Sequence, residues 1–181
     1  MEKSETMPLG VVIERQRSDH PWIDFNWRPV AVVPGAPVLD SQGEWTELRR
    51  GEGWVQYHCG TLRLELFRAE TESYKVNLSQ NPPCIYVLLR RDDDPESPHS
   101  YLPFLVTASP YEAQDYLDSG EEIVEPVPMP EDVAAFVQAF VDAHHVDEVF
   151  TKRKRKKAAP GDELFSRRPP VSLPPKDRRS P

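Results

Sequence analysis

The sequence predicts an α+β domain: a mostly antiparallel β-sheet or partial barrel of about seven strands, followed by two helices and a disordered basic C-terminal tail. Segments with β-branched residues or apolar–polar alternation fill the chain up to residue 107. Helical patterns follow only after that point, and strands followed by helices are typical of the α+β class. We expect a disordered N-terminus at residues 1–6, a single globular domain at 7–151 and a basic, proline-rich disordered tail at 152–181.

The strand predictions rest on local patterns. The leucines of residues 62–67 alternate with mostly polar residues, which indicates a strand with one buried face. Residues 85–89 form a continuous apolar run, as a central strand does, whereas Pro103 places its segment at an edge or a bulge. The expected strands are residues 9–15, 29–33, 54–58, 62–67, 74–78, 85–89 and 102–106, with a hairpin at 59–61. Residues 121–129 read as an extended connector or edge strand.

Two helices carry the clearest local signals. Ser109 and Glu112 form a capping box with proline at the first helical position, and Gly120 is suited to end that helix in the left-handed conformation. A second helix is expected to open near Pro130. Its apolar residues recur at helical spacing and form one stripe, made of Val133, Phe136, Val137, Phe140, Val141 and His144. We expect that stripe to close one open face of the sheet.

The charge of the chain is divided between its two parts. Residues 152–181 carry a net charge of +8, whereas residues 1–151 carry −16. The basic run begins the tail and is expected to bind a polyanion or an acidic protein surface; it consists of Lys152, Arg153, Lys154, Arg155, Lys156 and Lys157. The acidic body and the lack of interleaved aromatic residues in the tail argue against a nucleic acid as the partner.

Composition also bears on the compartment. No stretch approaches the roughly 18 apolar residues of a membrane span, and the first residues lack the apolar segment of a secretory signal. The two cysteines, Cys59 and Cys84, do not make a disulfide framework and are expected to be reduced. We therefore expect a cytoplasmic protein without a membrane span.

One segment is dense in the side chains that binding sites use. Between residues 19 and 28, aromatic rings alternate with charged and polar groups. Rings provide a large contact area at a small entropic cost, so this segment is the predicted binding site. Its residues are Asp19, His20, Trp22, Asp24, Trp27 and Arg28. The competing interpretation is that the tryptophans anchor a loop on the sheet.

A second candidate surface lies on the first predicted helix, which is strongly acidic. We predict docking of a partner at Tyr111, Glu112 and Asp115, although a solvated acidic helix face explains the same pattern. No catalytic residues and no metal ligands are predicted. Neighbouring residues of a strand point to opposite faces, so His58 cannot serve Cys59 as a base, and no paired zinc-ligand motif is present.

Four stretches of the chain resemble one family. They are MPLGVVIERQRSDHPWIDFNWRPVAVVPG, LELFRAETESYKVNLSQ, PYEAQDYLDSGEEIVEPVPMP and FVDAHHVDEVFTKRKRKK, and together they span most of residues 7–157. The family consists of uncharacterised bacterial proteins with a domain of unknown function. Their genes are often found beside those of molybdenum-dependent formate dehydrogenase, and some carry the name molybdopterin-guanine dinucleotide biosynthesis protein A.

The resemblance implies a setting and no catalytic residue. It favours a cytoplasmic accessory protein that assists maturation or assembly of a molybdenum-cofactor formate dehydrogenase through protein–protein contacts, with a subunit of that enzyme as the partner. One alternative is an enzyme or carrier of molybdopterin cofactor biosynthesis, acting on the guanine dinucleotide form. Another is a nucleic-acid-binding regulator that uses the basic tail. No cofactor of the protein itself is expected, and molybdopterin stays open as a ligand.

Overall fold

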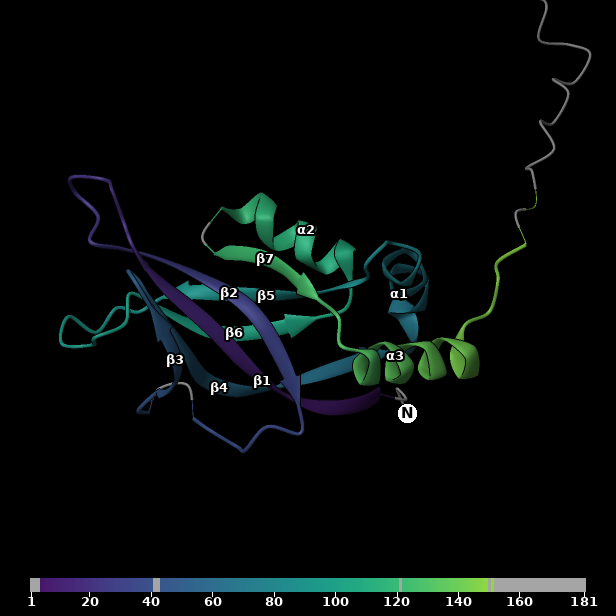
Figure 1. The fold of residues 1–181 in the computed structure, drawn as a ribbon. Coiled ribbons are helices and arrows are strands. Elements are labelled where there is room, and N and C mark those ends of the chain that lie inside the picture. Colours follow the sequence, from purple (N-terminus) through teal and green to yellow (C-terminus); the bar gives the residue numbers. More distant parts are fainter. Residues whose placement is uncertain (1–3, 41–42, 121, 150, 152–181) are drawn as a thin grey trace, which may run out of the picture. The chain divides into compact units, whose positions relative to one another are not determined.

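The computed structural model describes residues 4–40, 43–120, 122–149 and 151. The chain divides into two units, Met1–Val146 and Asp147–Pro181, and all the elements below belong to the first. That unit contains two antiparallel β-sheets with helices packed at one end and beside the smaller sheet (Figure 1). The predicted α+β class is therefore confirmed, as two sheets and not a barrel.

The larger sheet is built from two hairpins. Its strands are β1 (Ser4–Arg17), β2 (Phe25–Pro34), β3 (Thr46–Gly51) and β4 (Trp54–Phe67). The spatial order β2-β1-β4-β3 places the two longest strands at the centre. Between Val11 and Ile13 the register shifts against both neighbours, so that Val30 of β2 and Cys59 of β4 are the extra residues of two bulges.

The smaller sheet has β5 in its middle. Its strands are β5 (Cys84–Arg91), β6 (Tyr101–Thr107) and β7 (Ile123–Pro128), in the order β6-β5-β7. The continuous apolar run of β5 belongs to the central strand, as predicted. Pro103 and Pro126 lie on the two edge strands, where a missing N–H is tolerated, and the register shifts beside Pro103.

Three α-helices occur in the described residues: α1 (Thr71–Leu78), preceded by the short 3-10 turn η1 (Arg68–Glu70), α2 (Pro110–Ser119) and α3 (Glu131–His144). The predicted cap of α2 is confirmed, because Ser109 Oγ accepts the Glu112 N–H at 3.1 Å and Gly120 has φ 70°. The reciprocal bond is relayed: Ser109 N–H donates to Thr107 Oγ1, which donates to the Glu112 carboxylate.

The core lies between the sheets and is sealed by α3. Its largest fully buried side chains come from both sheets and from α1 and α3, and include Leu9, Ile13, Leu64, Leu66, Tyr74, Ile85, Leu88, Leu89 and Phe140. In α3, the predicted stripe is buried at Val133, Val137, Phe140 and Val141 and only partly buried at Phe136 and His144. The prediction that this helix closes the core is confirmed.

Three sequence predictions are wrong. β1 begins at Ser4 and pairs with β4 from Ser4↔Phe67 onward, so residues 4–6 are not outside the domain. Residues 59–61 belong to the continuous strand β4, with a bulge at Cys59, and do not form a hairpin, because β1 pairs with both flanks. Residues 74–78 are the second half of α1 and not a strand. The tail at 152–181 lies outside the described residues.

The helix α1 was missed because its buried face is polar. Asn77 is fully buried and its side chain bonds the N–H and the carbonyl of Cys84 at 2.9 and 2.6 Å and the Ala108 carbonyl at 2.7 Å. Buried Tyr74 accepts the Phe67 N–H at 3.0 Å, and burial raises the pKa of its phenol to about 12. Distant backbone groups therefore hold α1 in place, which local apolar periodicity does not reveal.

Among the described residues, no helix is both long and apolar enough to cross a membrane.

Replacing Phe140 by Ala should lower the free energy of unfolding by about 3–5 kcal/mol, because the ring is 1% exposed and packs edge-on against Tyr74. Gln138→Ala on the exposed side of the same helix is the control, with an expected change within about 0.5 kcal/mol. Urea denaturation measures both. A loss below about 1 kcal/mol for Phe140→Ala would contradict a core sealed by α3.

Candidate functional site

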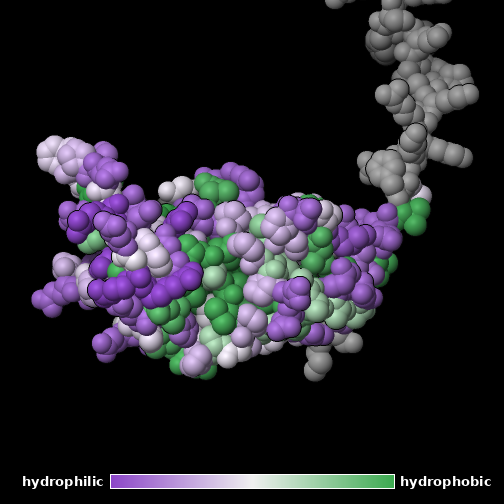
Figure 2. Space-filling model, viewed as in Figure 1, coloured by the Kyte–Doolittle hydropathy of each residue, from purple (hydrophilic) through white to green (hydrophobic). Residues whose placement is uncertain are grey.

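Two loops lie at the end of the domain away from α1 and α3. One joins β1 to β2 at residues 18–24, and the other joins β5 to β6 at residues 92–100 (Figure 1). Residues of both loops line a common cavity. In the space-filling view this end is mostly hydrophilic, whereas apolar residues are exposed toward the middle of the same face (Figure 2). We call this region the loop-end site. It comprises the rings of Trp27, Trp45, Tyr57 and His99 and the carboxylates of the 92–100 loop.

A cluster of four rings forms the base of the loop-end site. Trp45 and His99 stack at 3.5 Å between ring centroids and 5° between planes. Trp27 and Tyr57 meet this pair edge-on, each with its centroid 5.9 Å from that of Trp45. Trp27 faces inward from β2 and Tyr57 from β4, so the register of the larger sheet places both rings beside the 92–100 loop.

The cluster already holds one cation. The Arg15 guanidinium carbon lies 4.5 Å from the Phe25 ring centroid, 5.7 Å from that of Tyr57 and 5.9 Å from that of Trp27. These distances are within the range of cation–π attraction, which Arg makes more often than Lys. The rings of the loop-end site thus have faces suited to a guanidinium group.

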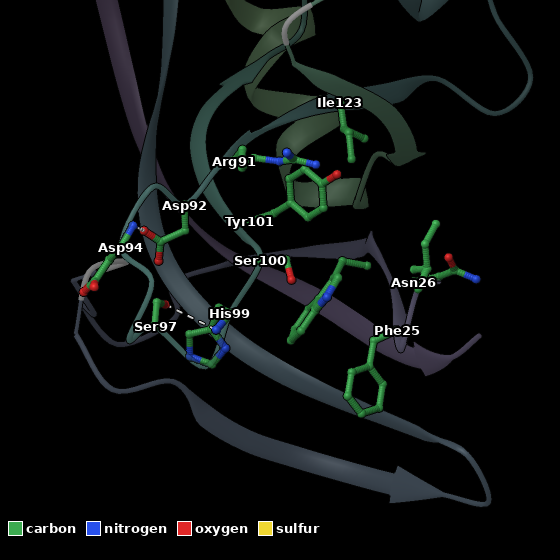
Figure 3. A pocket seen from close by; sticks show the side chains of 12 residues that line it. Phe25, Asn26, Arg91, Asp92, Asp94, Ser97, His99, Ser100, Tyr101 and Ile123 are labelled. Carbon is green, nitrogen blue, oxygen red and sulfur yellow. Dashed lines mark hydrogen bonds between the residues drawn. The ribbon is translucent and has the colours of Figure 1, made fainter. Parts of the chain in front are cut away.

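Two open cavities flank His99. The smaller has a volume of about 460 Å³; Figure 3 shows Asp92, Asp94, Ser97 and His99 along one side of it and Phe25 and Asn26 on the other. The larger has a volume of about 870 Å³ and shares Asp92, Asp94, Ser97 and His99 with the first. The 92–100 loop is therefore the common wall of both cavities.

Hydrogen bonds fix the acidic turn of the 92–100 loop. The Asp92 carboxylate accepts the Asp94 N–H and the Asp94 carboxylate accepts the Glu96 N–H, both at 3.0 Å. The Ser97 side chain bonds Asp92, which, with the Asp94 N–H, lowers the pKa of the Asp92 carboxyl. The Asp92 N–H also donates to the Ser100 carbonyl at 2.9 Å and closes the loop. The carboxylates are thus held in place by the backbone and by Ser97.

His99 is the titratable group at the centre of the site. Its backbone N–H donates to Ser97 Oγ at 3.2 Å (Figure 3), while its Nδ1 atom is buried and makes no hydrogen bond. Burial lowers the pKa of the imidazole, the Asp92 carboxylate raises it and Arg15 lowers it. The ring is therefore held as a neutral group stacked on Trp45.

The structure separates the residues of the predicted 19–28 binding site. Asp19, His20, Trp22 and Asp24 are exposed on the hairpin loop, where Trp22 keeps 87% of its surface accessible. The loop is closed by bonds of Ser18 N–H to the Asp24 carbonyl and of Trp22 N–H to His20 Nδ1. Trp27 is only 8% exposed and belongs to the ring cluster, so the anchoring interpretation holds for this tryptophan.

Arg28 points to the opposite face of the sheet. It donates to the Glu14 carboxylate at 3.2 Å, and Gln56 donates to the other oxygen of that carboxylate at 2.7 Å. Arg49 in turn donates to Gln56 at 2.7 Å, which completes a polar row across β2, β1, β4 and β3. Because the fully extended strand alternates its side chains, Trp27 and Arg28 do not share a site. Arg28 has a structural contact there.

The predicted docking residues lie elsewhere. Tyr111, Glu112 and Asp115 line a cavity of about 280 Å³ together with Glu70 and Glu72. The structure thus brings the three predicted residues together, beside the carboxylates of Glu70 and Glu72. Glu112 is engaged beneath this surface, since its carboxylate accepts from Thr107 at 2.5 Å. The basic run at residues 152–157 lies outside the described residues.

The reactive groups of the described residues are dispersed. Burial raises the pKa of the Cys59 thiol, which donates to the Val11 carbonyl at 3.1 Å, and burial also raises the pKa of Cys84. The neighbouring His58 ring lies 3.4 Å from Thr61 Oγ1. Within the described ranges no three His, Cys, Asp or Glu residues gather in a way that could hold a metal ion.

Several residues of the loop-end site were not predicted. Trp45, Tyr57 and His99 come from three separate segments, and residues 90–100 read as a plain solvated loop. The only local signal was the sequence Asp-Asp-Asp-Pro-Glu-Ser-Pro-His, in which side-chain acceptors alternate with prolines, as in loops with fixed turns.

Comparison with protein-family models matches residues 8–156 to a family described as Protein of unknown function (DUF3305). No curated protein and no solved structure gives a significant match.

Acidification should destabilise the protein through His99. Because its folded pKa is depressed, the stability that the neutral ring contributes is present above the ordinary pKa of about 6.5 and is lost as pH falls through the lowered value. The wild-type melting temperature should fall more between about pH 7 and about pH 5 than that of His99→Phe, which keeps the stack without the titration. Equal falls in the two proteins would contradict this account.

Proposed function

The chain belongs to the family of unknown function DUF3305, and we propose that it is an accessory protein for maturation or assembly of a molybdenum-cofactor formate dehydrogenase. One resemblance and one structural observation support this proposal. The sequence resembles proteins encoded beside formate dehydrogenase genes. The loop-end site combines an exposed tryptophan with an open, ring-lined cavity, which is the composition of a protein-binding surface. The protein acts through contacts with a subunit of the enzyme and works in the cytoplasm.

The observation that carries the proposal is the exposure of Trp22. Trp22 lies at the tip of a hairpin that is closed by its own hydrogen bonds. With 87% of its surface accessible, its side chain is not part of the core. Ile23 beside it is 48% exposed and Phe25 is 37% exposed. Together they form an apolar projection next to the cavity, and such groups dominate binding energy when a partner covers them.

The alternative is an enzyme or carrier acting on molybdopterin guanine dinucleotide. The smaller cavity has rings against which a planar heterocycle could stack, and the carboxylates of Asp92 and Asp94 could accept its N–H groups. The phosphates of a dinucleotide fit less well, because Arg91 is the single Lys or Arg among the described residues that line this cavity. The charge of the site therefore favours a protein partner over this ligand.

Trp22→Ala should impair partner binding without loss of stability, whereas Trp27→Ala should lower the stability of the fold. Trp22→Ala should abolish co-purification of formate dehydrogenase subunits and change the free energy of unfolding by less than about 0.5 kcal/mol. Trp27→Ala should cost about 3–5 kcal/mol of stability, because this ring is buried. The matched control is Val38→Ala, which removes a 90% exposed apolar side chain outside the site. Retention of the enzyme by Trp22→Ala would contradict the proposed binding surface.

Deleting the gene should lower formate dehydrogenase activity and leave other enzymes that share the molybdenum cofactor unchanged. An assembly factor acts on its own client, whereas a cofactor-synthesis enzyme supplies all of them. Activities of formate dehydrogenase and of a second molybdenum enzyme, assayed in the same extracts, measure the difference. A parallel loss of both would instead favour the biosynthetic alternative. Restoration by the wild-type gene but not by Trp22→Ala links the phenotype to the loop.

A further inference from the structure

The larger cavity of the loop-end site has walls of one charge. Four carboxylates line it, those of Glu44, Asp92, Asp94 and Glu96, and no Lys or Arg of the described residues does. Glu44, Asp94 and Glu96 belong to exposed residues, and Asp92 is partly buried. We call it the acid-rimmed cavity.

Within the described residues, hydrogen bonds reach two of these carboxylates and leave their charge in place. The Asp92 carboxylate accepts from Ser97 and from a backbone N–H, and the Asp94 carboxylate accepts from a backbone N–H. These neutral donors orient the two carboxylates without cancelling their charge. In the portion of the chain that the structure describes, none of the four forms an ion pair with Lys or Arg. By contrast, the acids Glu14, Glu47 and Glu122 do so. Four carboxylates without a Lys or Arg partner among the described residues, two of them fixed by hydrogen bonds, attract cations.

The floor of the acid-rimmed cavity is aromatic. It is formed by the rings of Trp45, Tyr57 and His99. Arg15, which does not line the cavity, lies within cation–π distance of the Tyr57 ring. Of these three rings, Tyr57 thus already faces a guanidinium, at 5.7 Å from its centroid. Rings combined with carboxylates recognise an alkyl-linked cation better than either group alone, since the ring covers the alkyl stem and the carboxylate binds the head.

We propose that the acid-rimmed cavity binds an arginine- or lysine-containing segment of the partner protein. The inference rests on the proposed function and specifies the chemistry of the partner. A volume of about 870 Å³ exceeds one side chain and suits a few residues. An anionic partner would meet four like charges, and a purely apolar one would bury those carboxylates without a counter-charge. Trp22, on the loop whose Ile23 lines the smaller cavity, then contacts the same partner outside the acid-rimmed cavity.

The test uses the full chain and two short synthetic peptides. One alternates glycine with arginine, and the other carries citrulline in place of each arginine, which keeps the shape and removes the charge. Isothermal titration calorimetry should detect binding of the arginine peptide, weaker at high salt, and no binding of the citrulline peptide. Equal binding of the two peptides, or binding of neither, would overturn the proposal.

Paired variants assign the binding to the cavity. Glu44→Gln combined with Glu96→Gln should weaken the arginine peptide about tenfold or more. Glu65→Gln combined with Glu125→Gln removes the same charge from exposed strand positions outside the cavity and should change affinity less than about twofold. Melting temperatures verify that both proteins are folded. Equal effects of the two pairs would show general electrostatic attraction and would overturn the site.

Two further results separate this inference from its premise. If the arginine peptide does not bind while Trp22→Ala still abolishes co-purification of formate dehydrogenase, only the inference fails. If the peptide binds at the cavity but the enzyme never co-purifies, the basic-segment site holds and the proposed function fails. Concentration-dependent self-association that the Glu44→Gln and Glu96→Gln pair abolishes would assign the cavity to a second copy of this chain, against the proposal.

Discussion

The pairing of β1 with β4 connects the two ends of the domain. The ladder runs from Ser4↔Phe67 beside the helices to Gln16↔Trp54 beside the loops. Its middle buries Leu9, Val11 and Ile13 against the smaller sheet and α3. Because side chains alternate along a strand, the register that buries these residues also turns Arg15 and Tyr57 toward the loop end. A slip of one residue would expose the core and dismantle the ring cluster together.

Buried polar bonds and accessible aromatic and acidic side chains therefore lie at different ends of the larger sheet. At the helical end, buried polar bonds of Asn77, Ser73 and Ser109 join α1 to β5 and α2. At the loop end, rings stack in the interior while Trp22 and the carboxylates of the 92–100 loop remain accessible. His99 belongs both to the packed rings and to the open surface, since it stacks on Trp45 and lines both cavities.

Local signals predicted the elements whose stability is local. The apolar run of β5, the cap of α2 and the stripe of α3 each lie within one segment, and each was found from the sequence. The helix α1 was read as a strand because its buried side chains are polar and bond to distant residues. The predicted binding site at 19–28 treats these residues as one unit, whereas the alternation of β2 assigns Trp27 and Arg28 to opposite faces. The meeting of Trp45, Tyr57 and His99 depends on strand register and a loop, which no local pattern contains.

We expect the partner to contact the loop end and not the acidic surface of α1 and α2. Hydrogen–deuterium exchange of the full chain, alone and with purified formate dehydrogenase, tests it directly. The enzyme should slow exchange in residues 18–26 and 92–100 and leave exchange in residues 70–78 and 110–116 unchanged. Slower exchange confined to residues 70–78 and 110–116, or no change anywhere in the chain, would contradict it.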